Sequence, residues 1–225
     1  CFLDSDTLLD HEDVAGELLR PFADPKIGGV TTAQRVYRPK SGPERISDWL
    51  ENARLYASMA GGSLFGQVGC LPGRLYAVRS SIVAERMDEL VDDRWRFLFR
   101  KPVQCYAGDD RVITNFVLQA GYRTTLMPTA SVKTLVPDNY PKLWKTWERW
   151  GRSSQGYTLR GLNWNWRKPF VLFQYTTDIL ISLATVYLVA IHWPYNFFFG
   201  DSNLPLAQAI IMSGAGMCLT VLFRQ

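Results

Sequence analysis

The chain has 225 residues, and its 25 Lys and Arg against 21 Asp and Glu give a formal net charge of +4. This excess is too small to argue for nucleic acid as a partner. With 47% hydrophobic and 20% charged residues, the composition excludes a disordered chain and a collagen-like one.

The cysteines and histidines exclude several site classes. The four cysteines lie far apart, at Cys1, Cys70, Cys105 and Cys218, without a CxxC pair. This spacing excludes a zinc ribbon and a thioredoxin-like motif, and it favours reduced thiols on a cytosol-facing or buried protein. With only two histidines, a His-rich metal site or a Ser/His/Asp triad is not expected. Because the chain starts at Cys1 and ends directly after an apolar run, we expect it to be part of a longer protein.

Residues 1–140 alternate short apolar strands with amphipathic helices. Strands are expected at 2–3, 27–37, 75–78 and 124–127. Helical spacing of apolar side chains predicts helices over 8–19, 43–60 and 112–118. Strands interleaved with helices favour an α/β layered domain with a largely parallel sheet.

A basic segment follows at 141–168, with seven Lys or Arg against Glu148 alone. Its cationic residues gather on one helical face, whereas Trp147 and Trp150 lie on another. Such a helix is typical of the headgroup region of a membrane, and Trp164 and Trp166 would form an aromatic girdle beside it. Because cationic flanks stay cytoplasmic, residues 1–168 are expected on the cytosolic side.

Two apolar runs end the chain. Asp178 is the only charge in 170–193, and 204–223 has none. Each run reaches the roughly 20 residues that span a bilayer, so transmembrane helices are predicted at 169–193 and 203–223. The alternative is a pair of buried core helices. Gln174 and Asp178 are unusual for a lipid-facing helix and would face a bundle interior or a polar path, unless Asp178 lies near the interface.

The first candidate for chemistry is Asp4-Ser5-Asp6-Thr7, directly after a predicted strand. Two carboxylates one residue apart suit a divalent cation that holds a diphosphate. Asp6 alone would equally serve as a helix N-cap. A phosphatase DxDxT and an EF-hand loop are both excluded, because Leu8 and Leu9 occupy positions where they need polar residues or glycine.

The second candidate is Gly108-Asp109-Asp110-Arg111, at the start of a predicted helix. The helix dipole favours ionised acids there, and such a carboxylate can accept a proton from a hydroxyl nucleophile. Arg111 would fix the backbone or a neighbouring acid. The alternative is a capped helix with a surface salt bridge.

The third candidate is Thr146-Trp147-Glu148-Arg149-Trp150, on the basic helix. Arg149 offers forked donors to phosphate, and Trp150 offers an apolar wall to a sugar ring. The alternative is membrane anchoring alone.

Taken in order, LDSDT, GCLPGRLYAVR at 69–79, GDDR and TWERW resemble the membrane-embedded family-two glycosyltransferases, which include hyaluronan, chitin and cellulose synthases. GDDR together with Thr114-Asn115 and Ala120-Gly121-Tyr122 is most similar to hyaluronan synthases and hyaluronan-synthase-like fungal enzymes. The resemblance implies that 1–140 is the C-terminal part of a GT-A catalytic domain. An interfacial segment at 141–168 and the two transmembrane helices would follow.

The resemblance also implies roles for individual residues. Asp4 and Asp6 would hold Mn²⁺ or Mg²⁺ on a nucleoside diphosphate. Asp110 would be the catalytic base, supported by Asp109 and Arg111. The residues expected to bind substrate are Arg149 and Trp150 on the basic helix, with Cys70, Pro72, Gly73 and Arg79 from the acceptor-side loop. The chain departs from the family in two places, with Thr146 where the family has Gln and Cys-Leu-Pro-Gly-Arg where hyaluronan synthases have Ser-Gly-Pro.

The implied function is that of a metal-dependent inverting hexosyltransferase. It would use a UDP-sugar to extend a cell-surface polysaccharide at the cytosolic face of the plasma membrane. Processive synthesis coupled to translocation is the leading form, with membrane lipid as a further partner. The alternatives are transfer of a single sugar to a lipid or oligosaccharide, and an inactive scaffold of a polysaccharide synthase complex.

Overall fold

The computed structural model describes residues 1–91, 94–95, 103–104, 108–161 and 164–187. The strands are β1 Phe2–Leu3, β2 Thr7–Leu9, β3 Ile27–Val36, β4 Leu75–Val78, β5 Arg94–Trp95, β6 Val103–Gln104 and β7 Arg123–Thr134. The α-helices are α1 Val14–Leu19, α2 Gly42–Ala53, α3 Ala60–Leu64, α4 Ser80–Ala84, α5 Met87–Val91, α6 Asp109–Gln119, α7 Tyr140–Gly161 and α8 Pro169–Tyr187. Two 3₁₀ turns, Arg20–Ala23 and Asn165–Arg167, and a π-helix at Arg54–Met59 complete the order.

The main sheet has five strands in the order β1-β4-β3-β7-β2. Only the β3–β7 pair is parallel, while β1–β4, β3–β4 and β2–β7 are antiparallel. The expectation of a largely parallel sheet is therefore wrong. Alternation of apolar side chains shows which residues a sheet buries, but strand direction leaves no mark on that alternation.

The predicted strands at 2–3 and 75–78 match β1 and β4, and the predicted helices over 43–60 and 112–118 match α2 with its continuation and α6. The predicted helix over 8–19 is wrong in its first half, because it begins only at Val14. Leu8 and Leu9 instead lie in β2, where they pair with Lys133 and Val132 of β7. Pairing with a distant strand overrides the helical spacing of these leucines.

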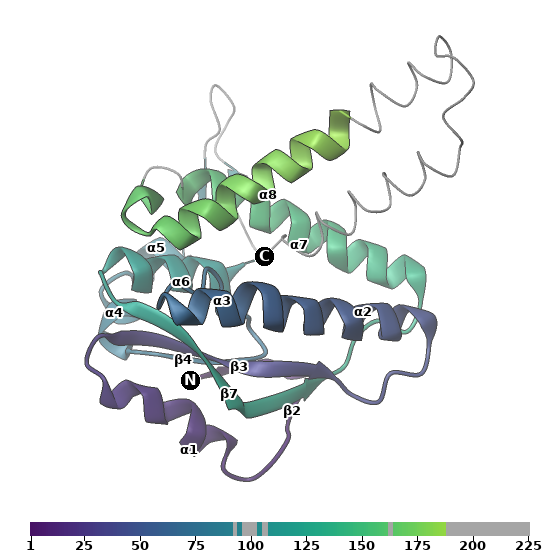
Figure 1. Cartoon of the computed structure of the whole chain (residues 1–225), viewed down its shortest axis with the longest axis horizontal. Helices are drawn as coiled ribbons and strands as arrows, with labels where there is room; N and C mark the ends of the chain where they lie inside the picture. The colour runs from purple at the N-terminus through teal and green to yellow at the C-terminus, as the bar shows by residue number, and fades with distance from the viewer. Residues whose placement is uncertain (92–93, 96–102, 105–107, 162–163, 188–225) are drawn as a thin grey trace.

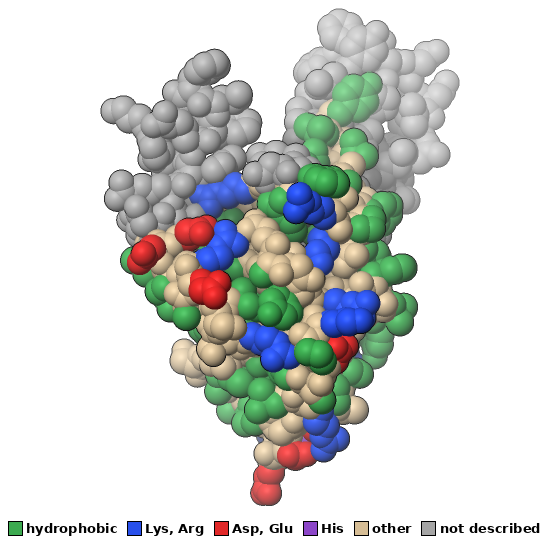
Figure 2. All heavy atoms as spheres, turned by 90° about the vertical axis from the view of Figure 1, so that its left-hand side faces the viewer, with side chains coloured by type: hydrophobic (Ala, Val, Ile, Leu, Met, Phe, Trp, Pro, Cys, Tyr) green, Lys and Arg blue, Asp and Glu red, His purple; other side chains and the backbone are tan. Residues whose placement is uncertain are grey.

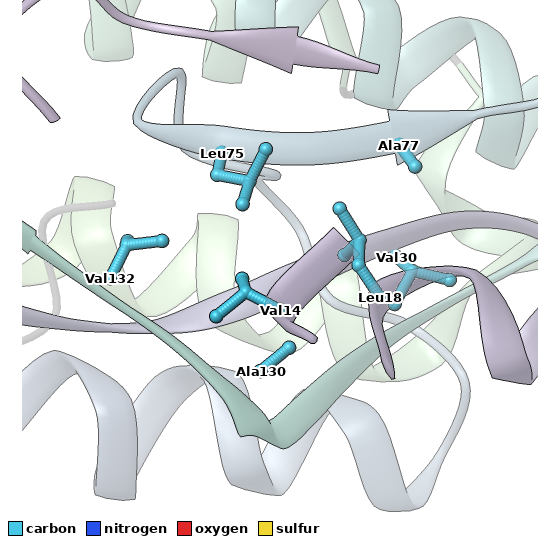
Figure 3. Packing of buried hydrophobic residues seen from close by; sticks show 7 residues of the cluster. All are labelled: Val14, Leu18, Val30, Leu75, Ala77, Ala130 and Val132. Atoms are coloured by element: carbon cyan, nitrogen blue, oxygen red, sulfur yellow. The ribbon is translucent and has the colours of Figure 1, made fainter. Parts of the chain in front are cut away.

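One face of the sheet is covered by α1, which packs on it through apolar side chains (Figure 1). Val14 and Leu18 of α1, both without exposed surface, point into the side chains of three strands (Figure 3). The strand residues of this cluster are Val30, Leu75, Ala77, Ala130 and Val132. Hydrophobic burial therefore stabilises the contact of α1 with the sheet.

The opposite face is covered by α2, α3 and α6, and α7 and α8 lie beyond this helical layer (Figure 1). The layer starts at Ser41, which caps α2 by a reciprocal pair of hydrogen bonds with Glu44. The helix runs on through the π-helix Arg54–Met59 into α3, so a continuous helical stretch crosses this face. Here apolar clusters alternate with buried polar and charged side chains.

Basic side chains are not gathered into one patch on the face that carries α4 and α5. Figure 2 shows Lys and Arg interspersed there with acidic and apolar side chains. This distribution agrees with the small net charge and gives no indication of a nucleic-acid surface on this face.

The basic segment predicted at 141–168 forms α7 and the turn after it, and α8 starts at Pro169, where the first apolar run was expected to enter a membrane. Within the described residues, no helix combines the length and the apolar character needed to cross a bilayer. Residues 188–193 and the second run at 203–223 lie outside the described residues. The two membrane spans therefore stay predictions.

Candidate active site

The loop at 69–74, between α3 and β4, connects the residues singled out from the sequence. The amide of Leu71 donates to Thr114 Oγ1 at 2.9 Å, and the amide of Gly73 donates to Asp110 Oδ2 at 3.3 Å. Thr114 Oγ1 in turn donates to the carbonyl of Asp110 at 2.7 Å. The loop is thus fastened to the first turn of α6, and Asp110 is one of the two fastening points.

Asp110 accepts hydrogen bonds at both carboxylate oxygens. The amide of Arg111 donates to Oδ1 at 2.7 Å, while Oδ2 accepts from Gly73 and lies 3.8 Å from Cys70 Sγ. Burial raises the pKa of Asp110, the Arg111 amide opposes this rise, and the charge of Asp109 adds to it. When ionised, such a carboxylate is a stronger base than one in water, and its orientation is fixed.

The position of Asp110 depends on Gly108, the N-cap of α6. Gly108 has φ +105°, a left-handed conformation that favours glycine. A Cβ on Gly108 would also lie only 2.6 Å from Tyr157 Cε2 of α7. The glycine therefore allows the amino end of α6 to pack closely against α7.

Asp4 reaches the same loop from β1. Its amide donates to the carbonyl of Arg74 at 3.1 Å, which continues the β1–β4 pairing of Leu3 with Leu75. A Cβ on Gly73 would lie 3.1 Å from Asp4 Oδ2, so the carboxylate of Asp4 packs over a position that carries no side chain. Gly73 contacts Asp4 on one side and Asp110 on the other.

Asp4, Asp6, Asp109 and Arg149 share one electrostatic environment. Desolvation raises the pKa of Asp4, and the charges of Asp6 and Asp109 raise it further, while Arg74 and Arg149 oppose the rise. Such an accumulation of negative charge fits a divalent cation, which favours the ionised carboxylates. Across the described residues, no group of three or more metal-ligating side chains occurs. A pair of carboxylates suits Mg²⁺, which keeps waters and binds substrate phosphates at its other positions.

Arg149 and Trp150 lie on the exposed side of α7. Arg149 is close enough to Asp4 to lower its pKa, so the helix brings this guanidinium toward the acids. Trp150 is 44% exposed and presents an apolar surface next to it.

Arg111 is buried. Its Nε lies 3.3 Å from Tyr175 Oη of α8, and its Nη1 lies 3.3 Å from Ser154 Oγ of α7. Its backbone amide donates to Asp110, and its positive charge lowers the pKa of that carboxyl. Arg111 thus links the helix that carries the acids to both C-terminal helices.

Arg79 is not brought to this group. Its guanidinium donates to the carbonyls of Phe22, Asp24 and Ile27 at 2.8–3.1 Å. These partners place it directly after β4, where it holds the turn before β3, and its expected role in substrate binding stays a prediction. Pro72 is buried in the loop between Leu71 and Gly73 and shapes the backbone there.

Gln174 was expected on a polar path through a membrane. In the structure its amide donates to Ser58 Oγ of the π-helix at 2.8 Å. The start of α8 is therefore attached to the helical layer of the sheet. The side chain of Asp178 lies outside the described residues.

Tyr76 of β4 was not singled out from the sequence. It is buried, and its ring stacks on Phe2 with centroids 4.8 Å apart. Burial raises its pKa, and the charges of Asp109 and Asp110 raise it further, so the phenol stays neutral beside the acids. Its place within the 69–79 motif was the only sequence signal for a role near the site. A buried strand position does not by itself indicate that the acids of α6 lie nearby.

Comparisons with known proteins show the family of the chain. The sequence model described as "Glycosyl transferase family group 2" matches residues 1–225. An N-acetylglucosaminyltransferase from Rhizobium meliloti is 30% identical over 197 residues, which are 82% of this chain and 43% of that protein. Hyaluronan synthase 3 from Homo sapiens is 31% identical over 158 residues, 67% of this chain and 26% of that protein. The chain thus spans less than half the length of these relatives.

A solved structure shares the fold. A mannosyltransferase from Pyrobaculum calidifontis, in complex with GDP-Man and Mn²⁺, superposes with a TM-score of 0.52 at 15% identity. The match covers 98% of this chain and 59% of that one. Together with the family match, it confirms the GT-A-like α/β fold expected from the resemblance.

Proposed function

Because the chain belongs to glycosyl transferase family group 2, we propose that the protein carrying it transfers a hexose from a nucleoside diphosphate sugar, a UDP-sugar, to a growing polysaccharide. The transfer is metal-dependent and inverts the anomeric carbon. The names of the relatives make N-acetylglucosamine the first donor to test.

One observation carries the proposal. Asp110 and Asp4 are attached to consecutive residues of one loop, the first through the amide of Gly73 and the second through the carbonyl of Arg74. A general base and a diphosphate-binding carboxylate must lie on opposite sides of one reacting carbon. An arrangement that holds both from one short segment supplies the fixed spacing that such a transfer needs.

The donor side consists of Asp4, Asp6 and Arg149. The two carboxylates would hold Mn²⁺ or Mg²⁺, and a bound cation would neutralise charge on the leaving diphosphate. Arg149 donates to the same diphosphate from α7, where its positive charge already acts on Asp4.

The acceptor side consists of Asp110, the loop residues Cys70, Pro72 and Gly73, and Trp150. The acceptor hydroxyl attacks the anomeric carbon as the bond from that carbon to the diphosphate oxygen breaks. The hydroxyl proton passes to the carboxylate of Asp110, and the nucleoside diphosphate departs. Trp150 offers a wall for the sugar ring.

The basic helix α7 supports a membrane location. Its exposed Lys142, Lys145, Trp144 and Trp150 suit the headgroup region, so the catalytic part would lie at the cytosolic face of the plasma membrane with lipid as a partner. We further propose that the polysaccharide is extended processively and that its synthesis is coupled to its export across the membrane. Thr146, in place of the family's Gln, makes transfer of a single sugar the alternative to test beside it.

The experiment measures nucleoside diphosphate release by the full-length protein in membranes. The donors are UDP-N-acetylglucosamine, UDP-glucuronic acid, UDP-glucose and GDP-mannose, each with and without Mn²⁺. Asp110→Asn serves as the inactive variant, and sizing of the product separates a polymer from a single transfer. Metal-dependent release with one donor, lost in Asp110→Asn, supports the proposal. Absence of release with every donor, from folded protein, refutes it in favour of an inactive scaffold.

A further inference from the structure

A buried charged cluster lies beneath the loop at 69–74. It comprises Gln34 of β3, Glu51 of α2, Arg54 of the π-helix and Arg74, which follows Gly73. Each of the four is at most 7% exposed. Glu51 Oε1 lies 2.5 Å from Arg74 Nη1, and Glu51 Oε2 lies 2.7 Å from Arg54 Nη2. Glu51 therefore pairs with both arginines.

Gln34 completes the cluster. Its Oε1 accepts from Arg74 Nη1 at 2.9 Å and from Arg54 Nη2. Burial alone would raise the pKa of Glu51, but the charges of Arg54 and Arg74 outweigh it and hold the pKa below its ordinary value. Charges are seldom buried so completely unless they are paired, because desolvation of each one costs several kcal/mol.

The cluster reaches both candidate carboxylates through Arg74. The side chain of Arg74 is held by Glu51 and Gln34, while its carbonyl accepts from the Asp4 amide. The preceding residue, Gly73, donates to Asp110. Any movement of Arg74 would therefore shift the anchors of Asp4 and Asp110 together.

On the other side of the sheet, apolar packing alone surrounds the residue that follows Arg74. The neighbouring residue Leu75 packs against α1 in a fully apolar cluster. Well-packed apolar residues in place of a buried ion pair are often neutral or stabilising. The ion pair lies directly under the loop that holds Asp4 and Asp110. Its role is therefore to fix the position of that loop, for which a forked guanidinium is suited.

We propose that Glu51 and Arg74 are positioning residues, whose buried ion pair sets the loop that holds Asp4 and Asp110 at their working separation. Neither side chain contacts the reacting atoms. The expected effect on rate rests on the proposed function. The effect on the loop is measurable without turnover, because it concerns the hydrogen bonds that the backbone amides of Asp4 and Gly73 donate.

The variants are Glu51→Gln, Arg74→Met and Arg74→Lys in the full-length protein. Arg86→Met is the control for loss of an arginine–glutamate pair, because Arg86 pairs with Glu89 outside the site. Leu18→Ala, on the apolar face, is the control for loss of stability. The fraction of folded protein is measured for each variant, and rates are expressed per folded molecule.

The first readout is amide hydrogen exchange at Asp4 and Gly73. In Glu51→Gln and Arg74→Met, both amides should lose protection preferentially, while Leu18→Ala lowers protection more evenly and Arg86→Met leaves it unchanged. Retained protection of both amides in folded Glu51→Gln and Arg74→Met overturns the proposal, whether or not the protein turns over a donor. If one of these two variants does not fold, the comparison is made with the other alone.

The second readout is kinetic. Misplacement of the acids should lower kcat by roughly ten- to a hundredfold in Glu51→Gln and Arg74→Met. The donor KM should change much less. Arg74→Lys should recover part of the loss, because it keeps one charge but not the fork. The double variant Glu51→Gln with Arg74→Met should have a kcat no lower than that of the slower single variant, since both substitutions break the same pair. The positioning role is contradicted if the two kcat losses multiply in the double variant. It is also contradicted if kcat per folded molecule falls no further in Glu51→Gln and Arg74→Met than in Leu18→Ala. Absence of turnover in the unmodified protein counts against the proposed function alone.

Discussion

The two faces of the five-stranded sheet use the same strand for different purposes. On β4, Leu75 and Ala77 pack into the apolar cluster beneath α1, whereas Tyr76 and the preceding residue Arg74 lie on the side of the buried ion pairs and the acids. On the α1 face the cluster is apolar, whereas the opposite face buries Asp110, whose pKa burial raises, and Glu51, whose pKa two arginines lower. The side of β4 that faces α1 thus contributes to stability, whereas the other side lies next to the residues proposed for chemistry.

The largest expected effect comes from Asp4→Asn on the polar face. Loss of a diphosphate-side carboxylate should lower kcat by roughly a hundredfold or more, since a bound cation supplies several kcal/mol of transition-state stabilisation. Stability should be kept, because Asp4 is exposed and neighbouring acids already disfavour its charge. Mn²⁺ titration of turnover, with thermal unfolding as the control, measures both. An unchanged Mn²⁺ requirement would remove Asp4 from the metal site.

On the apolar face, Leu18→Ala should have the opposite result. Leu18 has no exposed surface, so its truncation should cost about 2–5 kcal/mol of unfolding free energy. The rate per folded molecule should stay the same, because the α1 cluster contacts none of the acids. Denaturant unfolding and a rate assay on the same preparation test this. A fall in the rate per folded molecule would break the division between the faces.

The pH dependence sharpens the role of the polar face. Asp110 must be ionised to accept a proton, and its pKa is raised above the ordinary 3.8 by burial. The rate should therefore fall about tenfold per pH unit as pH drops below this raised pKa, and level off above it. The acid limb of the kcat profile should lie above pH 3.8. An acid limb at or below pH 3.8 would assign it to another group.

The raised pKa also has a consequence for stability. A carboxyl that binds its proton more tightly when folded stabilises the fold below its unfolded pKa, and this contribution is lost as pH rises through the folded pKa. Asp110→Asn should thus be no less stable than the unmodified protein near neutral pH, as thermal unfolding across pH would measure.

The smallest effect is expected at Ser41, at the start of α2. Ser41→Ala removes the side chain that accepts from the Glu44 amide at 3.3 Å, which should cost about 1 kcal/mol. Because α2 also carries Glu51, this variant asks whether a modest loss of helix stability on the polar face lowers the rate by itself. We expect no change per folded molecule. A fall comparable to that in Glu51→Gln would show that helix stability, and not the ion pair, governs the site.

Local patterns in the sequence were enough to identify much of the molecule. Short apolar runs predicted β1, β3 and β4, and helical spacing predicted α2 and α6, because these elements bury a face defined by neighbouring residues. The two acidic motifs were found for the same reason, since carboxylates directly after a strand or at a helix start are visible within a few residues. The family match confirms the class of enzyme fold that their order indicates.

Only the tertiary structure decided how these pieces meet. The contact between Gly73 and Asp110 joins residues 37 positions apart, and nothing local encodes it. Glu51 and Arg79 show the same limit. Glu51 is buried beneath the site without having been singled out from the sequence, and Arg79 of the 69–79 motif binds backbone carbonyls away from the acids. Strand direction in the sheet was misjudged for a related reason. Side-chain alternation is a local property, whereas pairing, burial of charge and the distance between two acids are set by segments that the chain brings together only when it folds.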